Sequence, residues 1–205
     1  MESKLFTPVT FGPLTLRNRT IRSAAFESMC PGNAPSDMLL DYHRSVAAGG
    51  IGMTTVAYAA VTRSGLSFDR QLWMRPEIIP GLRELTDTIH AEGAAAGIQL
   101  GHCGNMSHKS ICGCTPVGAS GGFNLYSPTF VRGLRADELP EMARAYGRSV
   151  NLAREAGFDA VEIHAGHGYL ISQFLSPSTN HRKDEFGGSL QNRMRFMDMV
   201  MEEVM

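Results

Sequence analysis

The chain has 205 residues, of which 43% are hydrophobic and 19% charged, as in an ordinary globular domain. Its formal net charge of -1 argues against nucleic acid or an anionic membrane as a partner. It contains no apolar run of about 18 residues and no apolar stretch at its N-terminus. We therefore expect neither a transmembrane helix nor a secretory signal, and we expect a cytoplasmic protein.

Helix-like and strand-like segments alternate along the chain. The expected strands are residues 20–25, 51–61, 95–100 and 159–165. The expected helices are residues 36–48, 77–92, 137–156 and 189–205, with Ser36 and Asp137 as N-caps of the first and third. Such alternation predicts parallel βαβ units, in an open doubly wound sheet or a (β/α)8 barrel. Four units are half of a barrel, which needs about 250 residues.

Between the third strand and the third helix, residues 101–135 are rich in glycine and show little periodicity. They are expected to form one long loop, and loops of this length in compact domains are usually functional. Residues 103–135 are therefore a candidate lid over an active site. The chain has four cysteines, and Cys112-Gly113-Cys114 forms a close pair within this segment. The cysteines lack metal-finger spacing, so reduced cytosolic thiols are expected.

The clearest chemical pattern follows the fourth strand, where His164, His167 and Tyr169 lie in a glycine-rich turn. In a barrel, the carboxyl ends of the strands carry the active site. Two histidine N–H groups aimed at one point can hold a developing oxyanion, and a nearby tyrosine can deliver a proton. This trio suits the reduction of a double bond conjugated to a carbonyl. The histidines polarise the carbonyl, hydride reaches one carbon, and Tyr169 protonates its neighbour.

Two other interpretations of the trio remain open. His164 and His167 could bind a metal, with Glu162 as the nearest carboxylate, although two ligands do not close a site and Glu162 lies roughly 7 Å deeper along the strand. The three side chains could also be buried, satisfied core residues. Their shared position in one glycine turn at a strand end favours chemistry over the core interpretation, and no metal is expected.

Three segments resemble the Old Yellow Enzyme family of flavin reductases. These segments are residues 164–177 (HAGHGYLISQFLSP) with the spaced motif of residues 180–196, the opening residues 5–19, and residues 99–104 (QLGHCG). The resemblance covers nearly all 205 residues. It implies a TIM (β/α)8 barrel of which about the first four β/α units are present, so that residues 1–205 would be the N-terminal half of an FMN-binding domain, apparently truncated.

The resemblance also implies an activity and a set of site residues. FMN would take hydride from NADH or NADPH and pass it to an activated alkene, a small molecule. His164 and His167 would bind the substrate carbonyl, His164 would also contact the flavin, and Tyr169 would donate the proton. The remaining flavin contacts implied are Ala24, Ala25, Phe26, Tyr58 and Gln99.

The sequence departs from the family at the flavin. Many members have Pro followed by Thr or Cys where this chain has Ala24-Ala25-Phe26, and Tyr58 stands where alanine is usual. Arg182 and Asp184 are expected to pair with each other or with Arg193 and to fix the loop around the site. Arg22 and Glu27 could contact flavin or substrate, or form a salt bridge. Half a barrel also exposes sheet edges, which favours a homo-oligomer. The alternative function is therefore a non-catalytic half-barrel that self-associates or binds a partner.

Overall fold

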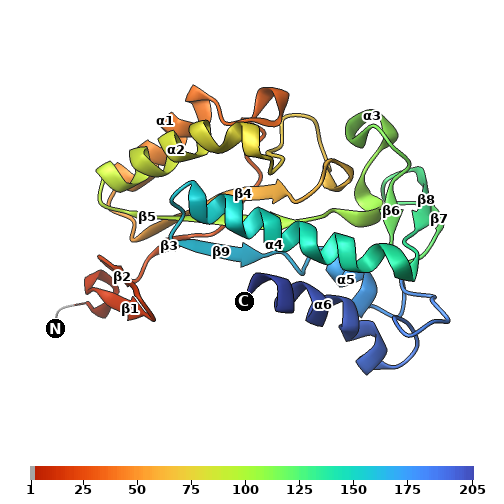
Figure 1. Cartoon of the computed structure of the whole chain (residues 1–205). Helices are drawn as coiled ribbons and strands as arrows, with labels where there is room; N and C mark the ends of the chain where they lie inside the picture. The colour runs from red at the N-terminus through yellow and green to blue at the C-terminus, as the bar shows by residue number, and fades with distance from the viewer. Residues whose placement is uncertain (1–2) are drawn as a thin grey trace. The chain divides into compact units, whose positions relative to one another are not determined.

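The computed structural model describes residues 3–205, and these form two compact units (Figure 1). The first unit comprises the described part of Met1–Ala59, with Arg70–Gln99 and Asn151–Glu162. The second unit comprises Ala60–Asp69, Leu100–Val150 and Ile163–Met205. The chain passes from one unit to the other several times, and each unit is described by itself.

A four-stranded sheet contributes its larger part to the first unit, and its strand order is β3-β4-β5-β9. The strands are β3 (Ile21–Arg22), β4 (Met53–Ala60), β5 (Ala95–Gly101) and β9 (Ala160–Ile163). β3 and β4 are parallel, with Ile21 opposite Met53. The four predicted strands are thus confirmed. The first is shorter than expected, because only Ile21 and Arg22 of residues 20–25 pair with β4.

The first two predicted helices are also confirmed in the first unit. α1 (Asp37–Ala48) begins at Ser36, whose hydroxyl accepts a hydrogen bond from the Leu39 N–H at 3.4 Å. α2 (Ile79–Ala91) packs beside α1 and buries Leu82, Leu85 and Ile89 (Figure 1). This apolar spacing is the helical pattern seen in the sequence. An antiparallel hairpin, β1 (Val9–Phe11) with β2 (Leu14–Leu16), precedes the sheet.

The prediction of one long loop at residues 101–135 is wrong. In the second unit this segment forms α3 (Lys109–Cys112) and a three-stranded sheet of order β6-β8-β7. Its strands are β6 (Val117–Gly118), β7 (Gly122–Asn124) and β8 (Thr129–Gly133). The backbone N–H and C=O groups of so long a segment need hydrogen-bond partners, and here the three strands bond to one another. Phe123 and Phe130 form a cross-strand pair with ring centroids 5.2 Å apart.

The remaining helices are α4 (Leu139–Glu155), whose last residues belong to the first unit, α5 (Leu170–Leu175) and α6 (Leu190–Val204). Asp137 was wrongly expected to cap α4. A 3-10 turn, Ala136–Glu138, precedes the helix, and the Glu138 carboxylate accepts from the Arg135 N–H at 2.8 Å. Asp137 instead pairs with the Arg135 guanidinium at 3.0 Å. α5 packs against α6 through Phe174 and Phe196.

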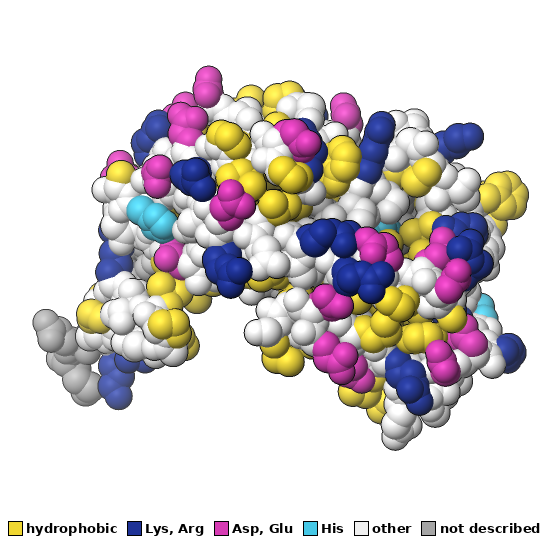
Figure 2. Space-filling model, viewed as in Figure 1, with side chains coloured by type: hydrophobic (Ala, Val, Ile, Leu, Met, Phe, Trp, Pro, Cys, Tyr) yellow, Lys and Arg dark blue, Asp and Glu magenta, His cyan; other side chains and the backbone are white. Residues whose placement is uncertain are grey.

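Charged side chains of opposite sign are interspersed on the face shown in Figure 2, as the small net charge suggests. Among residues 3–205, no helix combines the length and the apolar character needed to cross a membrane.

Candidate active site

The structure brings His164, His167 and Tyr169 together in the second unit. The His164 N–H donates to the Leu100 carbonyl at 2.8 Å, which holds the residue beside the end of β5. Nε2 of His164 lies 3.2 Å from Nδ1 of His167. The Tyr169 ring lies edge-on to the His164 ring, with centroids 5.0 Å apart. Two imidazole nitrogens and a phenol therefore converge on one small region.

The turn that carries the trio has an unusual backbone. His167 has φ 55°, in the left-handed region that residues other than glycine rarely adopt, and Gly168 follows with φ 68°. This conformation turns His167 back toward His164 within three residues. Such strain persists only where the surrounding structure fixes it, and it concentrates at functional sites.

Gln173 is the residue that fixes this turn, and the sequence analysis did not single it out. Its buried amide nitrogen donates to the carbonyls of Gly168 at 2.6 Å and Cys103 at 3.2 Å. Its amide oxygen accepts from the Asn105 N–H at 3.2 Å. A Cβ at Gly104 would lie 2.3 Å from that oxygen, so only glycine allows the approach. Gln173 lies within the motif of residues 164–177, on the buried face of α5, and a polar residue at such a position needs hydrogen-bond partners.

The protonation state of Tyr169 follows from its surroundings. Burial raises the pKa of the Tyr169 phenol, Cys103 adds to the increase, and a hydrogen bond with Ser67 opposes it. The phenol is therefore protonated at neutral pH and can act as a donor.

A third histidine of the second unit, His102, has a structural role. Its Nδ1 accepts the Gly104 N–H at 2.9 Å, so the ring proton is on Nε2, which lies 3.0 Å from the Ser64 hydroxyl. Complete burial lowers the pKa of His102 to about 3. A ring whose nitrogens are both engaged within the protein holds the loops in place.

A cavity of about 510 Å³ opens beside the trio in the second unit. His167 and Gly168 border it on one side, and Phe123, Leu125 and Tyr126 of the β7–β8 hairpin border it on another. The hairpin thus lies beside the histidine turn, and its role as a lid stays a prediction.

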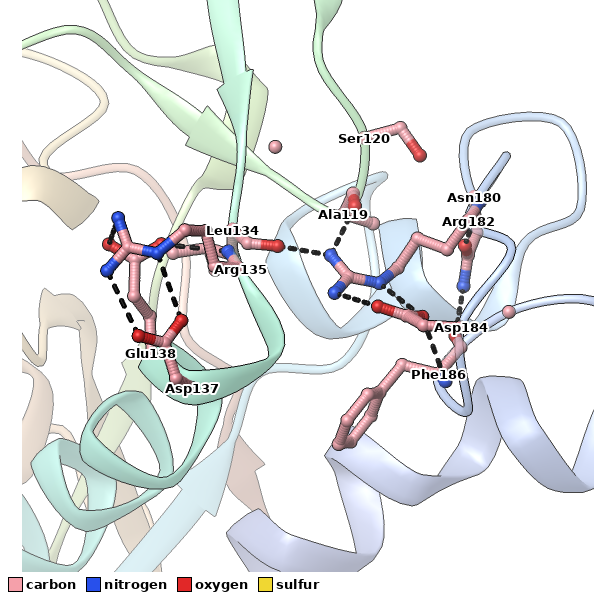
Figure 3. A network of polar contacts seen from close by, with 12 residues as sticks. Ala119, Ser120, Leu134, Arg135, Asp137, Glu138, Asn180, Arg182, Asp184 and Phe186 are labelled. Atoms are coloured by element: carbon pink, nitrogen blue, oxygen red, sulfur yellow. Dashed lines mark hydrogen bonds and ion pairs between the residues drawn. The ribbon is translucent and has the colours of Figure 1, made fainter.

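Figure 3 shows the centre of the spaced motif of residues 180–196, where the expected pairing of Arg182 with Asp184 is confirmed. Arg182 pairs with Asp184 at 2.6 Å, and its guanidinium donates to the carbonyls of Ala119, at 3.0 Å, and Leu134. The hydrogen bond from Arg182 lowers the pKa of the Asp184 carboxyl. This network ties the segment before α6 to the ends of β6 and β8. Ser189 caps α6 by accepting from the Asn192 N–H at 3.2 Å.

The residues expected to contact flavin lie in the first unit, apart from His164. Ala24, Ala25 and Phe26 follow β3, and Phe26 is 73% exposed. Tyr58, on β4, and Gln99, on β5, are buried. Two small residues and an exposed ring suit a flat aromatic group, and the Gln99 amide suits the polar edge of a flavin. These residues therefore fit the cofactor in chemistry, and their role as contacts stays a prediction.

Arg22 and Glu27 form the expected salt bridge, 2.7 Å long, in the first unit. Glu27 also accepts from the Ala57 N–H at 3.1 Å and lies 3.1 Å from Nε2 of the fully buried His43. Glu27 is thus enclosed by partners from three directions.

The metal interpretation finds no ligand set in the described part of the chain. Within residues 3–205, no group of three or more His, Cys, Asp and Glu side chains is placed to hold a metal ion. In the first unit the Glu162 carboxylate accepts from the Gln99 amide at 2.5 Å.

Comparison with known proteins identifies relatives along the whole chain. The chain is 42% identical over 200 residues to the 4,4'-dithiodibutanoate disulfide reductase of Rhodococcus erythropolis, covering 98% of this chain and 50% of that protein. It is 37% identical over 209 residues to the NADPH dehydrogenase of Bacillus subtilis (strain 168), covering 100% of this chain and 60% of that protein. The chain thus spans about half to three-fifths of the length of these relatives.

Solved structures also match nearly the whole chain. The Old Yellow Enzyme homologue of Zymomonas mobilis matches with a TM-score of 0.91 at 30% identity, over 98% of this chain and 59% of that one. Morphinone reductase in complex with tetrahydroNAD matches with a TM-score of 0.90 at 28% identity, over 99% of this chain and 60% of that one. The predicted α/β fold, part of a TIM barrel, is confirmed. A sequence model of the NADH:flavin oxidoreductase / NADH oxidase family matches residues 4–205, and the chain belongs to that family.

Proposed function

We propose that this chain carries the catalytic residues of an FMN-dependent ene-reductase, which uses NADH or NADPH to reduce a C=C bond conjugated to an electron-withdrawing group. The substrate is a small molecule and the reaction takes place in the cytoplasm. The observation that supports this proposal is the convergence of His164, His167 and Tyr169 in one strained turn.

The two histidines bind and polarise the substrate. Nε2 of His164 and Nδ1 of His167 lie 3.2 Å apart. When the rings separate and each of these nitrogens carries a proton, a carbonyl or nitro oxygen between them can accept from both. Each such hydrogen bond strengthens as negative charge develops on the oxygen, which lowers the barrier. Gln173 keeps the turn, and therefore His167, in position.

Tyr169 delivers the proton. Its raised pKa keeps the hydroxyl protonated at neutral pH, and its ring centroid lies 5.0 Å from that of His164. Proton donation from Tyr169 to the α-carbon completes the reduction of the double bond.

FMN, when bound, supplies the hydride. Ala24, Ala25 and Phe26 would lie against its ring system, Gln99 would bond to its polar edge, and Tyr58 and His164 would complete the contacts. Exposed Phe26 and the small alanines beside it support this arrangement.

The cavity beside His167 would hold the remainder of the substrate. Its walls combine the aromatic Phe123 and Tyr126 with polar Asn105, Thr179 and His181. Because these aromatic residues stand on the β7–β8 hairpin, that hairpin would select among substrates.

The test is the visible absorption spectrum of the purified 205-residue chain before and after addition of FMN. We expect a protein-bound flavin band that NADH or NADPH bleaches without oxygen and that cyclohexenone restores. The matched control is the Gln99→Leu variant, which lacks the amide and should retain less flavin.

A chain that takes up no FMN would contradict the proposal. It would favour the non-catalytic half-barrel, and a concentration-dependent oligomer in analytical ultracentrifugation would then support self-association. Flavin that binds and is bleached, but is not reoxidised by any conjugated alkene, would reject the ene-reductase activity alone.

A further inference from the structure

The Cys112-Gly113-Cys114 segment of the second unit brings two thiols into contact. Sγ of Cys114 lies 3.6 Å from Sγ of Cys112, and Sγ of Cys112 lies 3.2 Å from the Cys114 carbonyl oxygen. The two sulfurs need to approach by about 1.6 Å to reach the ~2.04 Å of a disulfide bond. Rotation of the two side chains can supply such a movement, because the two sulfurs are already in contact.

Gly113 is what allows this contact. It ends α3 in the left-handed conformation, with φ 75° and ψ 4°, and its N–H bonds to the Lys109 carbonyl at 2.9 Å. The guanidinium of Arg63 covers the open side of Gly113, where a Cβ would lie 3.2 Å from an Arg63 nitrogen. A residue with a side chain would therefore meet both backbone strain and Arg63.

The two thiols differ in access. Cys112 is 2% exposed, whereas Cys114 is exposed and lines a cavity of about 550 Å³ in the second unit. Arg132 and Arg148 line the same cavity, with Glu138 and Glu141 as their ion-pair partners. A small molecule in this cavity can reach the Cys114 sulfur, and only Cys114 can then reach Cys112.

The charges around Cys114 act in opposite directions. Burial raises the pKa of the Cys114 thiol, and the contact with Cys112 raises it further, whereas Arg63 and Arg132 lower it. The thiol is therefore the resting form, and the two arginines stabilise the thiolate when it forms.

We propose that Cys112 and Cys114 are a redox-active dithiol that exchanges with low-molecular-weight disulfides. The Cys114 thiolate attacks one sulfur of the disulfide RSSR, the S–S bond breaks, and RS⁻ leaves and takes up a proton. The deprotonated Cys112 sulfur then attacks Sγ of Cys114, which releases the second RS⁻ and forms the Cys112–Cys114 bond. The two electrons lost by the cysteines reduce RSSR to two RSH.

The site needs neither flavin nor nicotinamide, so it is independent of the proposed reductase activity. Cys114 is exposed, and exposed disulfides are the readily reduced ones that serve as labile or regulatory bonds. Reversible oxidation of this kind is compatible with a reducing cytosol.

The test uses the 205-residue chain without FMN, equilibrated with oxidised glutathione, then denatured, alkylated with iodoacetamide and digested with trypsin. The tryptic peptide of residues 110–132 contains Cys112 and Cys114 and excludes Cys30 and Cys103. We expect this peptide to lose the mass of two hydrogens and both alkylation sites, and dithiothreitol to restore them. Cys30 and Cys103 are buried, and burial raises the pKa of Cys30 to about 12, so their peptides should stay alkylated.

Two variants assign the roles of the cysteines. Cys112→Ser should stop the reaction at the first step and leave glutathione on Cys114. Cys114→Ser should leave the buried Cys112 unmodified. The proposal is overturned if the wild-type peptide remains alkylated at both cysteines at every glutathione ratio, or if its only oxidised form is a stable glutathione adduct. Peptide mapping reads these outcomes, and the wild-type result alone decides the proposal.

Discussion

One histidine cluster in each unit shows how similar residues serve different purposes. In the first unit, Glu27 binds Arg22, His43 and the Ala57 N–H, and the second nitrogen of His43 lies 2.8 Å from the Thr54 hydroxyl. His43 is fully buried and every one of its polar atoms has a partner in the chain. This closed cluster can stabilise the fold, and it has no free position for a ligand.

The cluster of the second unit is open. His164 is buried, but His167 is exposed and borders a cavity of about 510 Å³, and Tyr169 is half-buried. Nε2 of His164 and Nδ1 of His167 lie 3.2 Å apart at this open cluster. Histidines that meet each other at a cavity wall can exchange that contact for a substrate oxygen, whereas His43 would have to leave a buried carboxylate. Solvent access, more than residue type, thus separates the two clusters.

The largest effect is expected at Tyr169. If the open cluster performs the chemistry, Tyr169→Phe removes the proton donor and slows alkene reduction by about 10²–10⁴-fold. Flavin reduction by NADPH should keep its wild-type rate, because no proton from Tyr169 is needed in that step. Stopped-flow absorbance separates the two half-reactions, and equal slowing of both would reject the role of Tyr169 as donor.

A substitution in the closed cluster around Glu27 should lower the stability of the fold. Glu27→Gln keeps the size of the side chain and removes its charge, so the partly buried Arg22 loses its counter-ion, and we expect the free energy of unfolding to fall by about 3 kcal/mol. Urea denaturation followed by circular dichroism measures this change. The control is Glu77→Gln, whose exposed pair with Arg75 is 4.0 Å long and should matter by less than about 0.5 kcal/mol. Similar midpoints for the two variants would mean that the Glu27 cluster adds no stability.

Much of the fold could be predicted because its signal is local. Leu82, Leu85 and Ile89 recur at helical spacing, and all three are buried in α2. The small sheet of residues 117–133 escaped prediction because β6 has two residues and β7 three, too few for an alternating pattern. Their pairing arises from tertiary contacts, such as that of Val117 with Arg132, and no window of sequence contains it.

The candidate site also contains residues that the sequence could indicate and residues that it could not. His164, His167 and Tyr169 could be proposed as a site from the sequence because they lie within six consecutive residues at a strand end. The residues that support them could not. Gln173 acts on Asn105, which is 68 positions away, and Ser67 reaches Tyr169 from a different segment of the chain. A contact between two segments that are far apart in the sequence produces no regular residue spacing, so the sequence does not reveal it.

The smallest expected effect concerns His102, a closed histidine in the same unit as the open cluster. Its pKa is about 3 in the folded protein and near 6.5 when unfolded, so below pH 6.5 the unfolded chain binds a proton that the folded chain does not. The free energy of unfolding therefore falls as the pH drops from 6.5 toward 3. In His102→Gln, the amide can accept from Gly104 and donate to Ser64 without titrating.

Comparison of urea midpoints at pH 7 and pH 5 tests this argument. Wild type should lose about 1–2 kcal/mol more than His102→Gln, because one pKa unit corresponds to about 1.4 kcal/mol. Carboxylates titrate equally in both proteins, so the difference between them isolates His102. Parallel pH profiles would mean that His102 can take up a proton in the folded state. The two hydrogen bonds of the His102 ring would then be insufficient to keep it unprotonated. Solvent access to the ring, and not the number of its hydrogen-bond partners, would decide whether a histidine belongs to the open or the closed group.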